Sequence, residues 1–253
     1  MNVFLTGASS GIGEALAAFY AGKGAVLGLY ARRRAAPAGL AAMLHADRHA
    51  WYAGDVRDAA ALGAAAQDFV ARFGLPDIVI ANAGISIGTL TEHAADLAPF
   101  RAVLETNVLG IVHTFQPFVA GMRAARRGKL VGIASVAGFR GVAGAGAYSA
   151  SKAAAISYLE ALRVELVGSG VDVITICPGF IATPMTVNNP YRMPFLLAPD
   201  KAARLIARAI ARGRRFYVLP WQMACLGRVL RLMPRPVYDR LFAKRLRKPR
   251  AST

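Results

Sequence analysis

The stretch Thr6-Gly7-Ala8-Ser9-Ser10-Gly11-Ile12-Gly13 follows a short apolar run and opens a helical stretch. Gly7 permits a tight turn, Gly11 removes a side chain where a backbone must approach a ligand, and Gly13 lets the helix pack closely on the strand. The start of the helix offers backbone N–H groups and the positive end of its dipole to a pyrophosphate. The stretch predicts a dinucleotide-binding turn, with an ordinary glycine-rich turn between strand and helix as the alternative.

Seven short runs rich in Val, Ile, Leu and aromatic residues are bounded by Gly, Pro, Asn or Asp, which is typical of strands. Most lack clean alternation, as strands covered on both faces do. The predicted strands are residues 2–5, 25–30, 50–53, 78–81, 129–134, 172–176 and 216–219. Helical stretches lie between them, at residues 12–23, 59–73, 100–124, 150–168 and 201–212. This alternation predicts an α/β fold with a parallel sheet flanked by helices.

The 253 residues are 55% hydrophobic and 18% charged. This length suits one large α/β domain or two small ones, and the composition excludes a disordered chain. Two cysteines, Cys177 and Cys225, are too few for a disulfide scaffold, and we predict no metal site. Three prolines interrupt the longest charge-free stretch, residues 173–191, so no membrane-spanning helix is expected. The first residues show no secretory signal, so we expect a cytoplasmic protein.

The net charge of +17 is unevenly distributed. Residues 1–200 contain 16 Lys and Arg against 13 Asp and Glu, whereas residues 201–253 contain 15 against one. The first part is therefore nearly neutral, at +3, and the second carries +14. This asymmetry predicts an anionic partner for the C-terminal region.

The pattern T-G-x-x-x-G-I-G at residues 6–13 resembles the cofactor turn of the short-chain dehydrogenase/reductase family. Asn82-Ala83-Gly84, after the fourth predicted strand, resembles the N-A-G signature of that family. Asp55-Val56 resembles its adenine-contacting Asp, with a helix N-cap as the alternative for Asp55. Pro178-Gly179, followed by Thr183, resembles the loop that passes the nicotinamide carboxamide.

The resemblance covers about residues 2–220. It implies a doubly wound Rossmann-type domain at residues 1–220, with seven parallel strands in the order 3-2-1-4-5-6-7, and leaves residues 221–253 as a basic extension. The implied cofactor-binding residues are Gly7, Ser9, Ser10, Gly11, Ile12, Gly13, Arg32, Arg33, Asp55, Val56, Asn82, Ala83, Gly84, Tyr148, Lys152, Pro178, Gly179, Ile181 and Thr183.

The end of the second predicted strand indicates which nicotinamide cofactor binds. By the resemblance, Ala31 occupies the place where NAD-preferring members carry an acid, and Arg32 the place where NADP-preferring members carry a basic residue. A guanidinium suits a 2′-phosphate through paired, charge-assisted hydrogen bonds. We favour NADP(H) over NAD(H), with Arg32 as the first candidate and Arg33 as the second. A solvated basic loop is the alternative.

Four further residues resemble the catalytic tetrad of the family in order and spacing. Tyr148 and Lys152 share one face of a predicted helix because they are four residues apart. Ser135 lies just past the fifth predicted strand and Asn107 within a long predicted helix. By the resemblance, Ser135 holds the substrate oxygen, Lys152 also bonds the nicotinamide ribose, and Asn107 anchors a water that resupplies protons. Asn107 could instead satisfy buried backbone groups, and we expect His113 to be packed without a role.

The chemistry of carbonyl reduction needs these residue types. Hydride delivery to a ketone leaves charge on oxygen, so a proton donor must stand there, and the pKa of a tyrosine is about 10. A lysine cation ~4 Å away, at an effective dielectric constant of ~20, supplies ~4 kcal/mol, enough to lower that pKa by ~3 units. The sequence therefore predicts an NADP(H)-dependent carbonyl reductase, or alcohol dehydrogenase, with Tyr148 as general acid or base.

The remaining predictions concern substrate and partners. The apolar segment 184–197 favours a lipophilic carbonyl or alcohol. The family implies a homodimer or homotetramer built through residues 100–124 and 150–168. The rival function is a non-catalytic NADP(H) sensor that acts through the basic extension.

The extension contains two predicted helices, residues 222–233 and 237–248, parted by prolines. Leu226, Val229, Leu230 and Met233 share a face of the first, and Tyr238, Leu241, Phe242 and Arg245 share a face of the second. With Trp221 and the surrounding basic residues, this pattern predicts an amphipathic hairpin on an anionic membrane through residues 221–250, at the cytoplasmic face. Packing on the body or a subunit contact is equally favoured, and nucleic acid ranks third.

Overall fold

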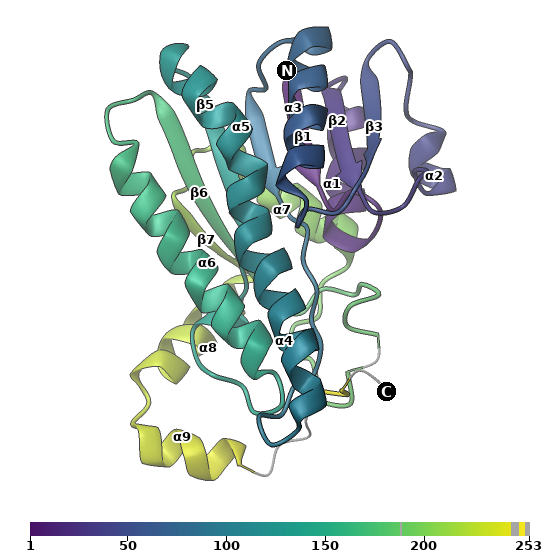
Figure 1. Ribbon diagram of the computed structural model, residues 1–253. Coiled ribbons are helices and arrows are strands. Elements are labelled where there is room, and N and C mark those ends of the chain that lie inside the picture. The colour runs from purple at the N-terminus through teal and green to yellow at the C-terminus, as the bar shows by residue number, and fades with distance from the viewer. Residues whose placement is uncertain (188, 244–247, 251–253) are drawn as a thin grey trace.

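The computed structural model describes residues 1–187, 189–243 and 248–250. Its sheet is parallel and has the strand order β3-β2-β1-β4-β5-β6-β7, as predicted (Figure 1). The strands are β1 Asn2–Thr6, β2 Val26–Ala31, β3 His49–Ala53, β4 Ile78–Ala81, β5 Gly128–Ile133, β6 Val171–Pro178 and β7 Phe216–Leu219. The predicted strands 78–81 and 216–219 match the observed ones, and the other five differ by one or two residues at their ends.

Helices cover both faces of the sheet (Figure 1). Phe4 of β1 packs on one side against Phe69 and Phe118, with ring centroids 5.6 and 4.9 Å apart. Val3 and Leu5 point to the opposite side, because side chains alternate along a strand, and join the core under α1 and α7. The helices within the described chain are α1 Gly11–Ala21, α2 Ala38–Ala41, α3 Ala59–Phe73, α4 Leu97–Leu104, α5 Gly110–Ala124, α6 Gly146–Glu165, α7 Pro199–Ala211, α8 Trp221–Leu232 and α9 Arg235–Phe242.

The long helix predicted at residues 100–124 is not continuous. A π-helical turn at Glu105–Leu109 separates α4 from α5. Within this turn Asn107 is buried and forms hydrogen bonds with the backbone of Ile85. The extra residue in the turn accommodates this inward side chain, which is a frequent use of π-turns at functional sites.

The extension forms two helices, but the packed face of α8 differs from the prediction. Met223 and Gly227 are buried, whereas Val229 is 58% exposed. Gly227 faces the ring of Phe139 so closely that a Cβ would lie 2.6 Å from Cδ2, and Met223 packs in the same way on Gly179. These two contacts rotate α8 and leave Val229 on the solvent side.

The helix α9 begins earlier than predicted, because Pro236 lies in its first turn, where a missing N–H is tolerated. Tyr238 donates a hydrogen bond to the carbonyl of Gly141 at 2.6 Å and lies under the guanidinium of Arg140. α9 ends at Phe242, before the predicted end at Lys248, which is described and is not helical. Arg245 of the predicted face lies outside the described residues. No helix in the described chain has the length and apolar character needed to cross a membrane.

Candidate active site

A cavity of about 210 Å³ lies at the carboxyl ends of the strands, where doubly wound sheets bind their ligands. The turn after β1, the ends of β2 to β6 and the first turns of α6 line it. Almost all predicted site residues line this cavity, although they are far apart in the sequence. Gly13, Arg33 and Asn107 are the predicted residues that do not line the cavity itself.

The glycine turn is held by close backbone contacts. Gly7 has a φ of 73°, which favours glycine, and a Cβ on Gly13 would overlap the carbonyl oxygen of Gly7. Asn82 fixes the turn from below, because its amide donates to the carbonyls of Thr6 and Gly7 at 3.1 and 3.2 Å. Asn82 of the N-A-G stretch therefore stabilises the glycine turn, a role that the sequence pattern alone did not predict.

The first turn of α1 fits an anion. Ser10 is its N-cap residue, but the Ser10 side chain makes no capping hydrogen bond. By contrast, Asp58 caps α3 by accepting from the N–H of Ala61 at 2.9 Å. Ser10, Gly11 and Ile12 line the cavity, so the uncapped donors and the positive dipole end lie at its wall. These features fit the pyrophosphate of a nicotinamide dinucleotide.

Two arginines follow β2 at the other end of the cavity. Arg32 lines it, whereas Arg33 donates to the carbonyl of Ser9 at 2.9 Å and so braces the glycine turn. Ala31, which precedes them, is buried and presents no acid. The cavity therefore has a cation and no carboxylate at the end of β2, which fits a 2′-phosphate better than a free ribose hydroxyl.

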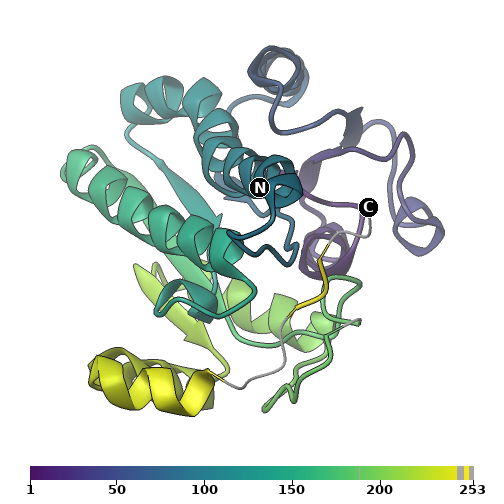
Figure 2. The same cartoon turned by 60° about the horizontal axis from the view of Figure 1, so that its bottom comes forward.

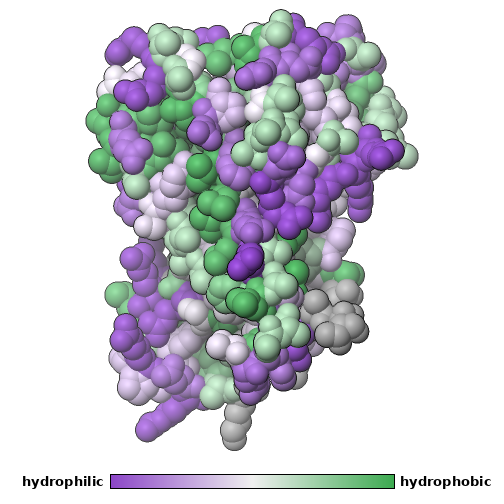
Figure 3. Space-filling view, viewed as in Figure 1, coloured by the Kyte–Doolittle hydropathy of each residue, from purple (hydrophilic) through white to green (hydrophobic). Residues whose placement is uncertain are grey.

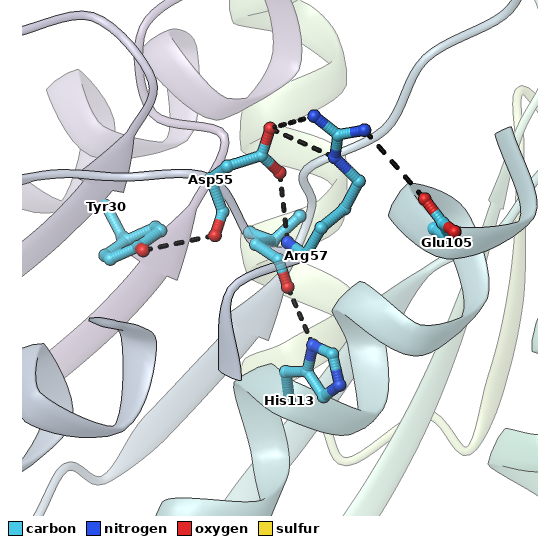
Figure 4. A network of polar contacts seen from close by, with 6 residues as sticks. Tyr30, Asp55, Arg57, Glu105 and His113 are labelled. Atoms are coloured by element: carbon cyan, nitrogen blue, oxygen red, sulfur yellow. Dashed lines mark hydrogen bonds and ion pairs between the residues drawn. The ribbon is translucent and has the colours of Figure 1, made fainter. Parts of the chain in front are cut away.

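Asp55 lines the cavity after β3 and is held by Arg57 (Figure 4). The Arg57 guanidinium lies 2.9 Å from one carboxylate oxygen, and the Arg57 N–H donates to the other at 3.0 Å. The hydrogen bond from Arg57 holds the pKa of Asp55 below its usual range, and attraction by Arg32 adds to this. The N-cap alternative for Asp55 is wrong, because Asp58 caps the helix.

The same network anchors the loop to its neighbours (Figure 4). The hydroxyl of Tyr30 donates to the carbonyl of Asp55 at 3.3 Å, and Arg57 lies 3.9 Å from Glu105 of the π-turn. The ring of His113 meets the carbonyl of Val56 through Nδ1 at 2.9 Å. His113 thus packs as expected but also fixes the loop that carries Asp55.

Ser135 and Tyr148 meet on the opposite wall. Ser135 follows β5, accepts from the N–H of Ala137 at 3.1 Å and donates to the carbonyl of Pro178 at 3.4 Å. Tyr148 lies in the first turn of α6 and lines the cavity with Ser135. Burial raises the pKa of Tyr148, and a hydrogen bond with Ser135 opposes that shift.

Lys152, one helical turn further on, is 4% exposed. Its ammonium donates to the carbonyl of Ile133 at 2.8 Å and lies 5.8 Å from the centre of the Tyr148 ring. Burial lowers the pKa of Lys152 to about 8. The expected lowering of the Tyr148 pKa by Lys152 is not found in this arrangement, because desolvation dominates at both groups.

Asn107 reaches the site from behind. Its amide nitrogen donates to the carbonyl of Ile85 and to Ser151 Oγ, both at 2.9 Å, and its oxygen accepts from the N–H of Ile85 at 2.8 Å. A Cβ on Gly84 would lie 3.1 Å from that oxygen and 3.7 Å from the Lys152 ammonium. Asn107 therefore satisfies buried backbone groups beside Lys152, and its water-anchoring role stays a prediction.

The model of the short chain dehydrogenase family matches residues 1–192. The chain belongs to this family. An uncharacterized oxidoreductase of Myxococcus xanthus is 38% identical, over 97% of this chain and 97% of its own length. The ketoacyl reductase HetN of Nostoc sp. is 35% identical, over 83% of this chain and 75% of that protein. A short-chain dehydrogenase from Streptomyces avermitilis, solved by crystallography, has a TM-score of 0.76 and 26% identity, covering 96% of this chain and 94% of that chain.

As a short-chain dehydrogenase, the protein is an oxidoreductase of small molecules that uses a nicotinamide cofactor. Its cavity has further lining residues that the motifs did not predict. They lie within three residues of predicted positions, at the strand ends, in the π-turn or in the loop after Thr183. Their place in the fold, and not a motif, is therefore the signal that finds them. They are Tyr30, Ala31, Gly54, Ile85, Thr106, Ile133, Ala134, Pro184, Met185 and Thr186.

Proposed function

We propose that the protein reduces a carbonyl substrate with NADP(H), or catalyses the reverse oxidation, with Tyr148 as general acid or base. One observation carries this proposal: Ser135, Tyr148 and Lys152 converge on the cavity that the uncapped end of α1 also faces. The bound cofactor would supply hydride to the carbonyl carbon, or accept it in the reverse direction. The glycine turn, Asp55 and the 178–183 loop would hold it.

Three side chains would act on the substrate oxygen and on its proton. Ser135 would hold the carbonyl oxygen by a donated hydrogen bond. Tyr148 stays protonated because its pKa is raised, so it would donate its proton as negative charge develops on that oxygen. Lys152 would hold the nicotinamide ribose and, beside Asn107, return a proton to Tyr148.

NADP(H) is the cofactor that the charges support. Arg32 lines the cavity at the end of β2, and Ala31 leaves this position without a carboxylate. We propose Arg32 as the ligand of the 2′-phosphate and Arg33 as a brace of the turn, because Arg33 is engaged with Ser9.

A lipophilic substrate is supported by the segment that follows Thr183. Met185 lines the cavity. Phe195 and Leu196, further along the same segment, are exposed apolar side chains. The related HetN is a ketoacyl reductase by name, which is compatible with a carbonyl on an apolar chain. A panel of ketones that differ in chain length would test this preference.

The experiment that tests the function compares Tyr148→Phe with Tyr158→Phe, a second tyrosine of α6. With NADPH and a panel of ketones and aldehydes, Tyr148→Phe should lower kcat by about 10²–10⁴-fold, with an unchanged Kd for NADPH. Tyr158→Phe should retain the wild-type rate. Cofactor binding by the wild type without turnover on any substrate would instead favour an NADP(H) sensor.

We also propose a homodimer or homotetramer built through α4, α5 and α6. Hydrophobic side chains gather on this face, over the end of α6 at the upper left and along α5 in the middle (Figure 3). Leu109, Val164 and Val167 are among the exposed ones. Sedimentation of Val164→Asp with Val167→Asp should show a smaller species than the wild type.

The extension, residues 221–253, is proposed as a separate unit that contacts an anionic membrane surface. Trp221 and Leu232 of α8 are 71% and 83% exposed. They share one face of the helix with Cys225 and Val229, opposite the packed Met223 and Gly227. Within the described part of the chain, nothing covers this apolar stripe. Its side chains would be stabilised if they were buried in lipid.

The charge around this stripe favours anionic lipid. Arg228 and Arg231 of α8 and Arg240 of α9 are exposed beside it, and Leu241 extends the apolar surface along α9. Basic residues that flank an apolar helix face are typical of helices that lie in the headgroup region. A packed hairpin would instead bury Trp221 and Leu232.

Vesicle flotation tests the membrane contact. Wild-type protein should float with phosphatidylserine-containing vesicles and not with pure phosphatidylcholine. Trp221→Ser with Leu232→Ser should weaken binding by at least about tenfold, whereas Met43→Ser, at an exposed apolar residue outside both proposed surfaces, should not. Absent flotation, together with a dimer that Trp221→Ser dissociates, would assign the stripe to a second copy of the chain.

A further inference from the structure

The last described residues, 248–250, run back from the extension to the body of the molecule (Figure 2). Pro249 accepts a hydrogen bond from the N–H of Gly88 at 3.0 Å, and Arg250 pairs with Gly88 in a short parallel bridge. Gly88 belongs to the loop that leaves the site after Ile85 and leads to α4. Residues 248–250 therefore add a short strand to the wall of this loop.

An ion pair between the buried Asp96 and the partly exposed Arg250 fixes this terminal strand. Asp96 is 6% exposed, and its carboxylate receives three hydrogen bonds of 2.9–3.1 Å from Nε and Nη2 of Arg250. It also accepts from the N–H of Leu90 at 2.7 Å. The hydrogen bonds from Arg250 hold the pKa of Asp96 below its usual range. Without Arg250, a buried carboxylate would lose its cation, which is costly.

Gly88 shows how closely the strand approaches. A Cβ at this position would overlap the carbonyl oxygens of Lys248 and Pro249. The loop can therefore carry only glycine here while residues 248–250 stay in place. The absence of a side chain at Gly88 is a second feature, independent of the ion pair, that allows residues 248–250 to pack here.

Lys248 connects the strand to the other side of the mouth. Its ammonium donates to the carbonyl of Met185 at 3.4 Å, and Met185 lines the cavity after Thr183. The terminal strand thus holds two loops at once: the one that runs from Ile85 to Asp96 and the one that carries Met185. Both loops contribute to the cavity wall.

We infer that residues 248–250 are a latch that positions the apolar segment 184–197 (the lid segment), with Arg250 as the positioning residue that acts through Lys248 and Met185. The inference rests on the proposed function for its kinetic consequence. The latch does not touch the glycine turn or Arg32, so it should influence the carbonyl substrate and leave the cofactor unaffected.

Kinetics of Arg250→Gln test the latch. KM for the carbonyl substrate should rise about tenfold, with kcat and the Kd for NADPH within about twofold of wild type. Arg250→Lys, which keeps the charge but not the paired geometry, should recover part of the KM. Arg101→Gln, an exposed arginine of α4, is the control and should behave as wild type. Equal KM values for Arg250→Gln and wild type would overturn the inference.

A second measurement keeps the latch testable if no substrate turns over. Trypsin cleaves after Arg192, an exposed residue of the lid segment, and mass spectrometry follows this cut specifically. Cleavage should be about tenfold faster in Arg250→Gln and in Gly88→Ala than in wild type or Arg101→Gln. Gly88→Ala displaces the strand without changing a charge, so it serves where Arg250→Gln fails to fold. Unchanged cleavage in both variants would refute the latch, whatever the activity.

Discussion

The cofactor end and the catalytic end of the cavity are built in different ways. At the cofactor end, backbone N–H groups of α1 and missing side chains at Gly7 and Gly13 make the site. At the catalytic end, the side chains of the half-buried Tyr148 and the buried Lys152 make it, and both are partly or fully desolvated. Stability and cofactor binding should therefore respond to a methyl group added at the cofactor end. At the catalytic end, the pH dependence of stability should respond to removal of the Lys152 ammonium.

The added methyl group is tested by Gly13→Ala, from which we expect the largest effect. Its Cβ would overlap the carbonyl oxygen of Gly7, so α1 or the turn must shift. The free energy of unfolding should fall by about 2–3 kcal/mol, and NADPH should bind at least about tenfold more weakly because the α1 donors move. Urea denaturation and cofactor titration measure the two effects.

Gly63→Ala is the matched control for this substitution. Gly63 lies in α3, where a Cβ would meet nothing within 4 Å. Alanine should stabilise the protein here by up to about 1 kcal/mol through helix propensity, with no effect on cofactor binding. If Gly13→Ala behaves like Gly63→Ala, close packing does not build the cofactor end.

The charge at the cofactor end is tested by Arg32→Ala. Removal of a charge-assisted contact to the 2′-phosphate should reduce the preference for NADPH over NADH by about 10–150-fold, since such a contact is worth about 1.5–3 kcal/mol. Arg33→Ala should have a smaller effect, because Arg33 is bonded to Ser9. The ratio of kcat/KM for the two cofactors measures both, and an unchanged ratio in Arg32→Ala contradicts its assignment.

Much of the cofactor end could be predicted because its parts are contiguous. The turn at residues 6–13 follows from a local pattern, whereas the strand order came from the resemblance to the family. The π-turn at Asn107 could not be predicted, because it depends on a hydrogen bond to Ile85, 22 residues away. The orientation of α8 likewise depends on the contact of Gly227 with Phe139. The periodicity of apolar residues within the helix cannot predict a contact with such a distant residue.

The ion pair of Arg250 with Asp96 is a second contact between distant residues that the sequence could not predict. Arg250 and Asp96 are 154 residues apart in sequence, and the basic composition of the extension gave no sign of their pairing. The pattern of charges predicted only that the extension would meet an anion. For Arg250 that anion is a buried carboxylate of its own chain, whereas the exposed arginines of α8 still face solvent.

The catalytic end is tested by the pH dependence of stability, where the expected effect is smallest. Burial lowers the pKa of Lys152 to about 8 from its usual 10.5, so the unfolded state binds more protons between these values. Stability should therefore rise with pH through this range and fall back as pH decreases toward 8. Relative to Lys152→Met, which removes this titration, the wild type should gain about 1 kcal/mol between pH 8 and pH 9. The raised pKa of Tyr148 does not interfere, because an unfolded tyrosine titrates only near pH 10. Parallel pH profiles of the two proteins in urea denaturation would mean that Lys152 is not desolvated, and the contrast between the two ends of the cavity would be lost.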